Sequence, residues 1–245
     1  MALIVDYPLS STFAGVNSLQ AMGIGIIGND APAGIPGSLV ISGGAMVATL
    51  RDTDPETYTG QRAEITAPAD PVGERWYCFD FYLPQDFQTS GSLLSVMQIH
   101  DTPDGGDSGK FPNFLLTVED EHIGVYVPNS SLPTEVATAR RVGTAPLVKG
   151  QWLSGCLHVN WQPNNTGFRE FFLNRVPLFR EFNVGTHYVD MVGPYFKLGL
   201  YDAFHRGAFG TRTAMFRNVK IYSGNEGYQS MMGGPPLPKP QIQIF

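Results

Sequence analysis

Three short stretches of this sequence carry polar side chains of catalytic type at alternating positions. They are GQRAEI with Arg62 and Glu64, SVMQIH with Gln98 and His100, and YFKLGLY with Tyr195, Lys197 and Tyr201. Successive side chains of a β-strand point to opposite faces, so residues two apart share one face. If the stretches are strands, each one therefore presents its polar residues together and its apolar residues on the opposite face.

These residue types are suited to binding an anion and moving a proton. Arginine, lysine and glutamine donate to a carboxylate, while histidine and tyrosine give up or accept protons. Alone, each stretch has an ordinary structural explanation: a strand histidine is more often a hydrogen-bonded structural residue, and an Arg-x-Glu pair is usually a cross-strand ion pair. Gathered on one surface, however, they would reduce stability, and such ionisable clusters are typical of functional sites.

The elements that position these residues are predicted to be strands. Period-two alternation recurs along the chain, whereas helical periodicity is almost absent. In ERWYCFDFYLP, for example, one face carries Tyr77, Phe79, Phe81 and Leu83. Clusters of Gly, Pro, Asn and Asp such as VPNSS and QPNNTG separate the segments and indicate turns. The pattern predicts an all-β protein of two antiparallel sheets packed as a sandwich or jelly roll, with one sheet face used for binding.

The domain organisation is predicted to be one domain and an arm. We find no internal repeat and no linker before IYSG, so residues 1–227 are expected to form a single β-domain. Residues 228–245 are proline-rich, which favours an extended segment. This arm either folds back on its own domain or contacts a neighbouring subunit, with QIQIF as an added strand. The second alternative would produce a homo-oligomer or a larger assembly.

Composition and charge exclude some classes of function. The 245 residues carry a formal net charge of −6 and show no basic surface, which argues against a nucleic-acid partner. An acidic substrate would need a local cluster of Arg and Lys inside a cleft. Cys78 and Cys156 lie on separate predicted strands without metal-type spacing. We expect them to be buried thiols, with a disulfide between them as the alternative.

The sequence gives no sign of a cofactor, a metal site or a membrane segment. The start, MALIVDYPLSS, has no basic region and too short an apolar run for a signal peptide or a membrane span. We therefore expect a protein that is cytoplasmic when made, unless a leader was removed or the protein leaves the cell by lysis; in the second case it would be extracellular or associated with a virion. In DTPDGGDSGK, the spacing of Asp101, Asp104 and Asp107 does not match a calcium loop, so a turn at the mouth of a cleft is the better interpretation.

Taken together, RAEI, QIH and YFKLGLY resemble the three signature stretches of the jelly-roll polysaccharide lyases, a group that includes alginate, glucuronan and heparin lyases. Their usual forms are R(S/T)E, Q(I/V)H and YFKxGxY, and they occur here in the family's order, over roughly residues 10 to 225. The resemblance implies a concanavalin-like β-jelly-roll sandwich of two antiparallel sheets. The sequence departs from the family pattern at Ile65 and Thr66, after Glu64, and at Asp202 and Ala203, after Tyr201.

The resemblance also implies an activity and roles for the matching residues. The activity is cleavage of an acidic, uronate-containing glycan by β-elimination, without a cofactor. Arg62 and Gln98 would hold the uronate carboxylate, and His100 and Tyr201 would transfer protons. Four further residues are expected to support substrate binding, the last of them from the stretch HVNW: Lys197, Glu64, Tyr195 and Asn160.

A different class of function is the alternative. A non-catalytic jelly roll could serve as a glycan-binding module or as a structural or decoration protein of a virion. The proline-rich arm, the start of the chain and the negative net charge favour this alternative. A phage-borne depolymerase would combine both interpretations.

Overall fold

The computed structural model describes most of the chain, and every regular element in the described part is a strand. The described residues are 3–7, 9, 13, 15–21, 24–28, 38–57, 60–70, 73–89, 93–102, 104, 110–128, 138–203 and 209–224. The predicted domain boundary at residue 227, the arm at 228–245 and Asp107 lie outside these ranges. Within them, no helix is long and apolar enough to cross a membrane.

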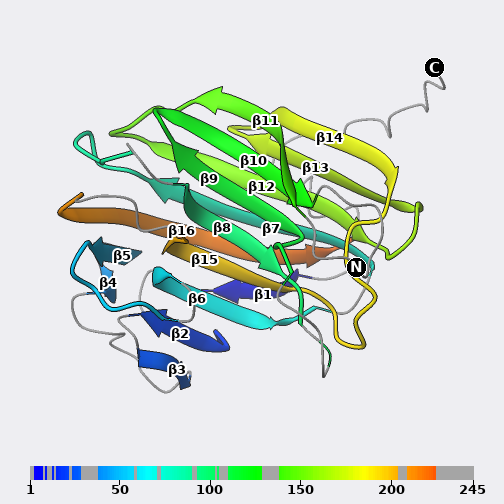
Figure 1. Ribbon diagram of the computed structural model, residues 1–245, viewed down its shortest axis with the longest axis horizontal. Coiled ribbons are helices and arrows are strands. Elements are labelled where there is room, and N and C mark those ends of the chain that lie inside the picture. Colours follow the sequence, from blue (N-terminus) through cyan, green and yellow to red (C-terminus); the bar gives the residue numbers. More distant parts are fainter. Residues whose placement is uncertain are drawn as a thin grey trace.

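The strands form two antiparallel sheets, which confirms the predicted fold class (Figure 1). The first, called the back sheet here, has β1 (Leu3–Tyr7) paired with β16 and otherwise the order β14 (Val176–Val184), β13 (Gly167–Leu173), β12 (Trp152–Trp161), β7 (Gly73–Tyr82), β16 (Thr211–Ser223), β5 (Ala45–Arg51) and β4 (Leu39–Ser42). The second, the site sheet, has the order β11 (Ala139–Pro146), β10 (His122–Pro128), β9 (Phe114–Glu119), β8 (Leu94–His100), β15 (Tyr195–Asp202), β6 (Gln61–Ala69), β2 (Ser18–Ala21) and β3 (Ile24–Gly28).

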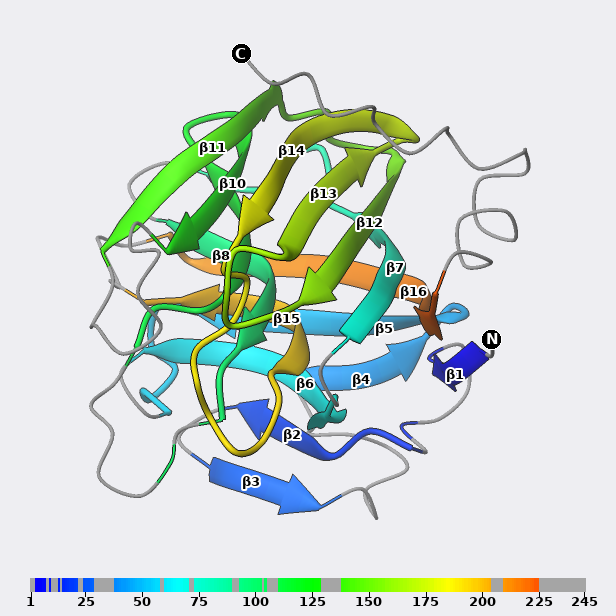
Figure 2. The same ribbon diagram turned by 90° about the vertical axis from the view of Figure 1, so that its right-hand side faces the viewer.

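One hydrophobic core lies between the two sheets. The alternation in ERWYCFDFYLP is confirmed, since its predicted inner face, Tyr77, Phe79, Phe81 and Leu83, is fully buried in this core. Tyr77 of β7 stacks on Phe196 of β15 with ring centroids 5.7 Å apart, so these two strands face each other across the sandwich. Burying an aromatic or aliphatic side chain of this size contributes about 1.5–3 kcal/mol. The edge strands β11 and β14 lie together at one end of the molecule, and β3 lies at the other (Figure 2).

A buried ion pair ties the sheets together directly behind the predicted site. Asp202 follows Tyr201 on β15, and its side chain points to the opposite face, into the sandwich. There its Oδ2 lies 2.9 Å from Nη1 of Arg212 on β16, and neither side chain is exposed. The aspartate that departs from the family pattern after Tyr201 therefore has an inward structural role.

The two cysteines form a disulfide, so the expectation of free thiols is wrong. Cys78 on β7 and Cys156 on β12 are directly opposite in the ladder of the back sheet. They lie on the face away from the main core, in a small buried cluster with Trp76, Phe172 and Tyr222. The cysteines are separated by 78 positions in the sequence, and the sequence does not show that β7 and β12 are neighbours.

Candidate active site

The three polar stretches become neighbouring strands of the site sheet. Strand β15 lies between β8 and β6, and both pairings are antiparallel. In this register Tyr195 pairs with His100, Lys197 with Gln98, and Tyr201 with Arg62. The apolar residues that alternate with them belong to the core: Ala63, Ile65, Met97, Ile99, Phe196, Leu198 and Leu200. The structure therefore gathers seven of the eight predicted site residues on the outer face of one sheet.

Gly199 makes the close approach of β15 and β6 possible. It has a φ of +144°, a region that side-chain-bearing residues rarely adopt. A Cβ at this position would lie 2.1 Å from the main-chain oxygen of Ala63. The pairing of β15 with β8 is also irregular between Leu198 and Tyr201. A bulge of this kind re-aims the following side chain, and here that side chain is Tyr201.

Replacing Gly199 by alanine is expected to lower both stability and activity. The added methyl group meets a main-chain oxygen rather than a movable side chain, so the strands must separate, at a cost of about 1–3 kcal/mol in the free energy of unfolding. Urea denaturation measures this loss. Gly43→Ala is the matched control, because Gly43 also has a positive φ, of 59°, but no atom lies within 4 Å of the place its new methyl group would take. Equal losses in the two variants would contradict the close-approach explanation.

A fully buried carboxylate, Glu64, organises the centre of the site. Its Oε1 accepts a hydrogen bond of 2.6 Å from Nε2 of Gln98, and its Oε2 lies 2.8 Å from Nζ of Lys197. Nη1 of Arg62 lies 3.5 Å from the same Oε2 and donates at 3.4 Å to Gln20 on β2. We call Arg62, Glu64, Gln98 and Lys197 the floor of the site.

Three of the four floor residues are almost fully buried. Glu64 is 0% exposed, Gln98 1% and Lys197 2%. Their expected roles in substrate binding therefore remain predictions. In the structure these three side chains hold one another in place beneath the surface of the site. Arg62 is the floor residue that lies against an accessible catalytic candidate, since its Cζ is 4.2 Å from the centroid of the half-buried Tyr201 ring.

The floor carries an excess of positive charge. Two cations, Arg62 and Lys197, surround the single carboxylate of Glu64. Burial lowers the pKa of Lys197, and the positive charge of Arg62 lowers it further, while Glu64 opposes the shift. Nζ of Lys197 lies 5.7 Å from the Tyr201 ring centroid. Preorganised positive charge of this kind stabilises negative charge that develops on a bound carboxylate or on the tyrosine oxygen.

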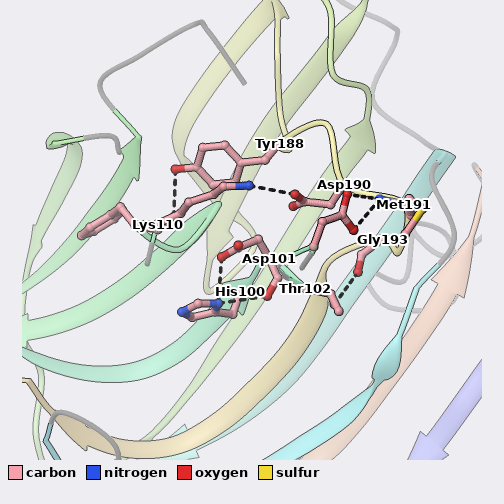
Figure 3. A network of polar contacts seen from close by, with 10 residues as sticks. His100, Asp101, Thr102, Lys110, Tyr188, Asp190, Met191 and Gly193 are labelled. Carbon is pink, nitrogen blue, oxygen red and sulfur yellow. Dashed lines mark hydrogen bonds and ion pairs between the residues drawn. The ribbon is translucent and has the colours of Figure 1, made fainter. Parts of the chain in front are cut away.

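His100, at the end of β8, is oriented by the residue that follows it (Figure 3). Its Nδ1 lies 2.9 Å from Oδ1 of Asp101 and 3.0 Å from the main-chain oxygen of Asp101. A carbonyl or carboxylate oxygen has no proton to donate, so the hydrogen bond to the main-chain oxygen assigns the proton of the neutral ring to Nδ1. Nε2 then has a free lone pair, and the His100 side chain is 28% exposed. The ring of Tyr195 lies beside it, with centroids 5.7 Å apart.

Asn160 is the one predicted site residue that the structure places elsewhere, so its assignment to the site is wrong. It lies on β12 of the back sheet, where its Nδ2 donates to the main-chain oxygen of Thr166 at 3.4 Å. Its neighbours Val159 and Trp161 point into the core, so Asn160 points outward from the opposite side of the sandwich. Alternation predicts which way a side chain faces relative to its own strand, but not the sheet to which the strand belongs.

Asp101 and Gln20 are the site residues that the sequence did not single out for these roles. Asp101 was interpreted only as a turn residue, although its position next to a candidate histidine was the available signal. Gln20 lies on β2 and reaches Arg62 through a pairing of β2 with β6 that no local motif indicates. Among the described residues, no group of three or more His, Cys, Asp or Glu side chains is arranged to hold a metal ion.

Comparison with known protein families identifies the family to which the chain belongs. A family model for polysaccharide lyases matches residues 12–220, which include the whole of this site. The chain belongs to the polysaccharide lyase family. It is accordingly an enzyme. This confirms the prediction, made from the three stretches, that the protein is a polysaccharide lyase. A search of curated proteins gave no match for this lyase.

Solved structures with the same fold extend over almost the whole lyase. An endo-β-1,4-glucuronan lyase from the fungus Trichoderma reesei is 19% identical with a TM-score of 0.70, and the match covers 91% of this chain and 96% of the other. A family 7 alginate lyase is 16% identical with a TM-score of 0.67, covering 90% and 100%. An alginate lyase from Pseudomonas aeruginosa is 18% identical with a TM-score of 0.56, covering 78% and 87%. These likenesses confirm the jelly-roll sandwich.

Proposed function

We propose that this lyase cleaves a uronate-containing acidic polysaccharide by β-elimination. The observation that carries the proposal is the buried, positively charged floor beneath Tyr201, on a sheet face that also presents His100. A net charge of −6 for the whole chain gives no general attraction to an anionic polymer. The local excess of Arg62 and Lys197 over Glu64 supplies that attraction at the point of reaction.

Elimination requires stabilisation of charge beside a carboxylate. The base removes the proton at C5 of the uronate, next to a group that is already negative, so the developing carbanion is strongly disfavoured in water. Arg62 pairs with the substrate carboxylate, and the remaining floor charge supports the enolate-like state that forms. A preorganised donor of this type is typically worth ~10²–10³ in rate. Gln98 and Lys197 contribute by fixing Glu64, which fixes Arg62.

Proton transfer is assigned to the two accessible groups, Tyr201 and His100. Tyr201 donates its phenolic proton to the C4 oxygen as the bond from C4 to that oxygen breaks. In glucuronate and mannuronate the C5 proton lies on the same side as the C4 oxygen, so Tyr201 also serves as the base in a syn elimination. In guluronate the proton lies on the opposite side, and Nε2 of His100 accepts it. General acid–base catalysis of this kind contributes ~10²–10⁴.

The comparisons support a uronate polymer as the substrate class. The glucuronan lyase and the alginate lyases with the same fold act on polymers of uronates, as their names state. The residues gathered here are of the types that such a substrate requires. Tyr195, half-buried beside His100, completes the accessible part of the site as a surface for a sugar ring.

A substrate panel tests the proposal. Purified protein is incubated with alginate, polyguluronate, glucuronan, heparin and capsular polysaccharides, and the ultraviolet absorbance of the new C4=C5 double bond is followed. We expect product from at least one polyuronate. Binding without product across the whole panel would contradict the proposal and favour a glycan-binding module.

A further inference from the structure

Asp101 has an unusual environment for a residue at the mouth of a site. Its side chain is 1% exposed, and among the described residues neither carboxylate oxygen makes a hydrogen bond, although Nδ1 of the His100 imidazole lies 2.9 Å from Oδ1. Burying a carboxylate without compensating partners is costly, so such a group is normally paired or functional. A positive charge on the His100 ring would compensate this carboxylate.

Residues that follow Asp101 contact the connection between β14 and β15 (Figure 3). Thr102 Oγ1 donates to the main-chain oxygen of Gly193 at 2.9 Å. The main-chain N–H of Met191 contacts both carboxylate oxygens of Asp104 at 3.2 Å. Nζ of Lys110 lies 2.8 Å from Oδ1 of Asp190. These contacts hold Thr102, Asp104 and Lys110 against the connection between β14 and β15, so the main chain next to Asp101 is held in place before any substrate binds.

The neighbouring Tyr188 hydroxyl does not compete with His100 for the Asp101 carboxylate. Burial raises the pKa of Tyr188 to about 12, and the charge of Asp101 is the second cause of that shift. The Tyr188 hydroxyl donates to the main-chain oxygen of Phe111 at 3.0 Å rather than to this carboxylate. The Asp101 carboxylate is therefore left to interact with His100.

We propose that Asp101 is the positioning residue for His100 as a catalytic base. The proposal rests on the proposed function and identifies a residue that neither the family match nor the three motifs assign. When Nε2 of His100 takes the C5 proton, the electrons of the C5–H bond form the C4=C5 double bond, the C4–O bond breaks, and Tyr201 protonates the departing oxygen. His100 becomes an imidazolium at that moment, and the fixed carboxylate of Asp101 stabilises it through Nδ1–H.

The Asp101→Asn variant separates the effect of the carboxylate charge from the effect of orienting the His100 ring. The main-chain oxygen of residue 101, at 3.0 Å from Nδ1, continues to accept its proton, so the neutral tautomer is retained. Charge-assisted hydrogen bonds are roughly twice as strong as neutral ones, so we expect kcat to fall about tenfold to a hundredfold on a polymer whose cleavage uses His100, with KM changed less than twofold. Asp86→Asn is the matched control: it removes the same charge from an exposed turn after β7, outside the site, and we expect it to leave kcat unchanged.

Two further measurements separate positioning from folding and from the proposed function. In a His100→Asn background, Asp101→Asn is expected to produce no additional loss of kcat; an equal loss there would show a structural effect and overturn the proposal. Modification of His100 by diethyl pyrocarbonate, measured where the imidazole is neutral, needs no substrate and is expected to slow severalfold in Asp101→Asn only. An unchanged modification rate together with unchanged kcat would also overturn it. Absence of product from the wild-type protein would instead contradict the proposed function, and the modification rates would still test the pairing.

Discussion

Replacing Tyr201 by phenylalanine is expected to lower kcat by ~10²–10⁴ while leaving the fold intact. The phenolic oxygen is the proton donor for the departing C4 oxygen in our proposal, and it stands directly beside the charged floor. The ring itself remains, so its contacts with Arg62 at 4.2 Å and Lys197 at 5.7 Å are preserved. The measurement is the initial rate of double-bond absorbance on the best polymer of the substrate panel, together with a thermal melt.

A second tyrosine serves as the control for this substitution. Tyr82 lies on β7 of the back sheet, where it packs on Trp152 with ring centroids 5.6 Å apart. Tyr82→Phe removes the same hydroxyl group at a distance from the site, and we expect it to keep the wild-type rate. Retention of activity within a factor of three in Tyr201→Phe would show that this hydroxyl is not the acid.

Glu64→Ala is expected to have the largest effect on stability of any site substitution. The carboxylate is fully buried, and its removal leaves Lys197 and Arg62 as buried cations without their shared partner. Breaking a buried ion pair from one side typically costs about 3–5 kcal/mol. In a chain of this size, each 1 kcal/mol lowers the melting temperature by roughly 2–4 °C. Activity should fall as well, because Gln98 and Arg62 lose the group that orients them.

A double variant separates the electrostatic explanation from simple loss of packing. In Glu64→Gln with Lys197→Met, the carboxylate and one cation disappear together, and the glutamine still offers an oxygen to the amide of Gln98. We expect this variant to regain much of the stability but little activity, since the positive floor is weakened. Thermal melts of both variants provide the test. Wild-type stability in Glu64→Ala would rule out a central role for this carboxylate.

Much of the fold was predictable because alternation is a local property. The inner face of β7, the outward polar faces of β6, β8 and β15, and the sandwich class all follow from period-two patterns. The partners of each strand do not follow from them. The disulfide between Cys78 and Cys156 and the position of Asn160 both depend on where β12 lies, and that is decided by packing over the whole chain.

The sequence therefore predicts which residues share a strand face better than it predicts their burial and contacts. Residue spacing alone places Gln98, Glu64 and Lys197 on one face of their strands. Their burial depends on how β8, β15 and β6 pair, and on the close approach of β15 to β6 at Gly199. In this pairing the three side chains form a buried support for Arg62. The ion pair between Asp202 and Arg212 could not be predicted for the same reason, because Arg212 lies on the opposite sheet.

Comparison of one polyuronate with its carboxyl-reduced form tests the central claim most directly. The claim is that the floor, in which the positive charges of Arg62 and Lys197 exceed the negative charge of Glu64, stabilises the substrate carboxylate during elimination. Reduction leaves the backbone of the polymer unchanged and replaces each carboxylate by a neutral hydroxymethyl group. We predict that the double-bond absorbance rises with the polyuronate and stays at background with the reduced polymer. Cleavage of both polymers, or release of reducing ends without a new double bond, would contradict the account.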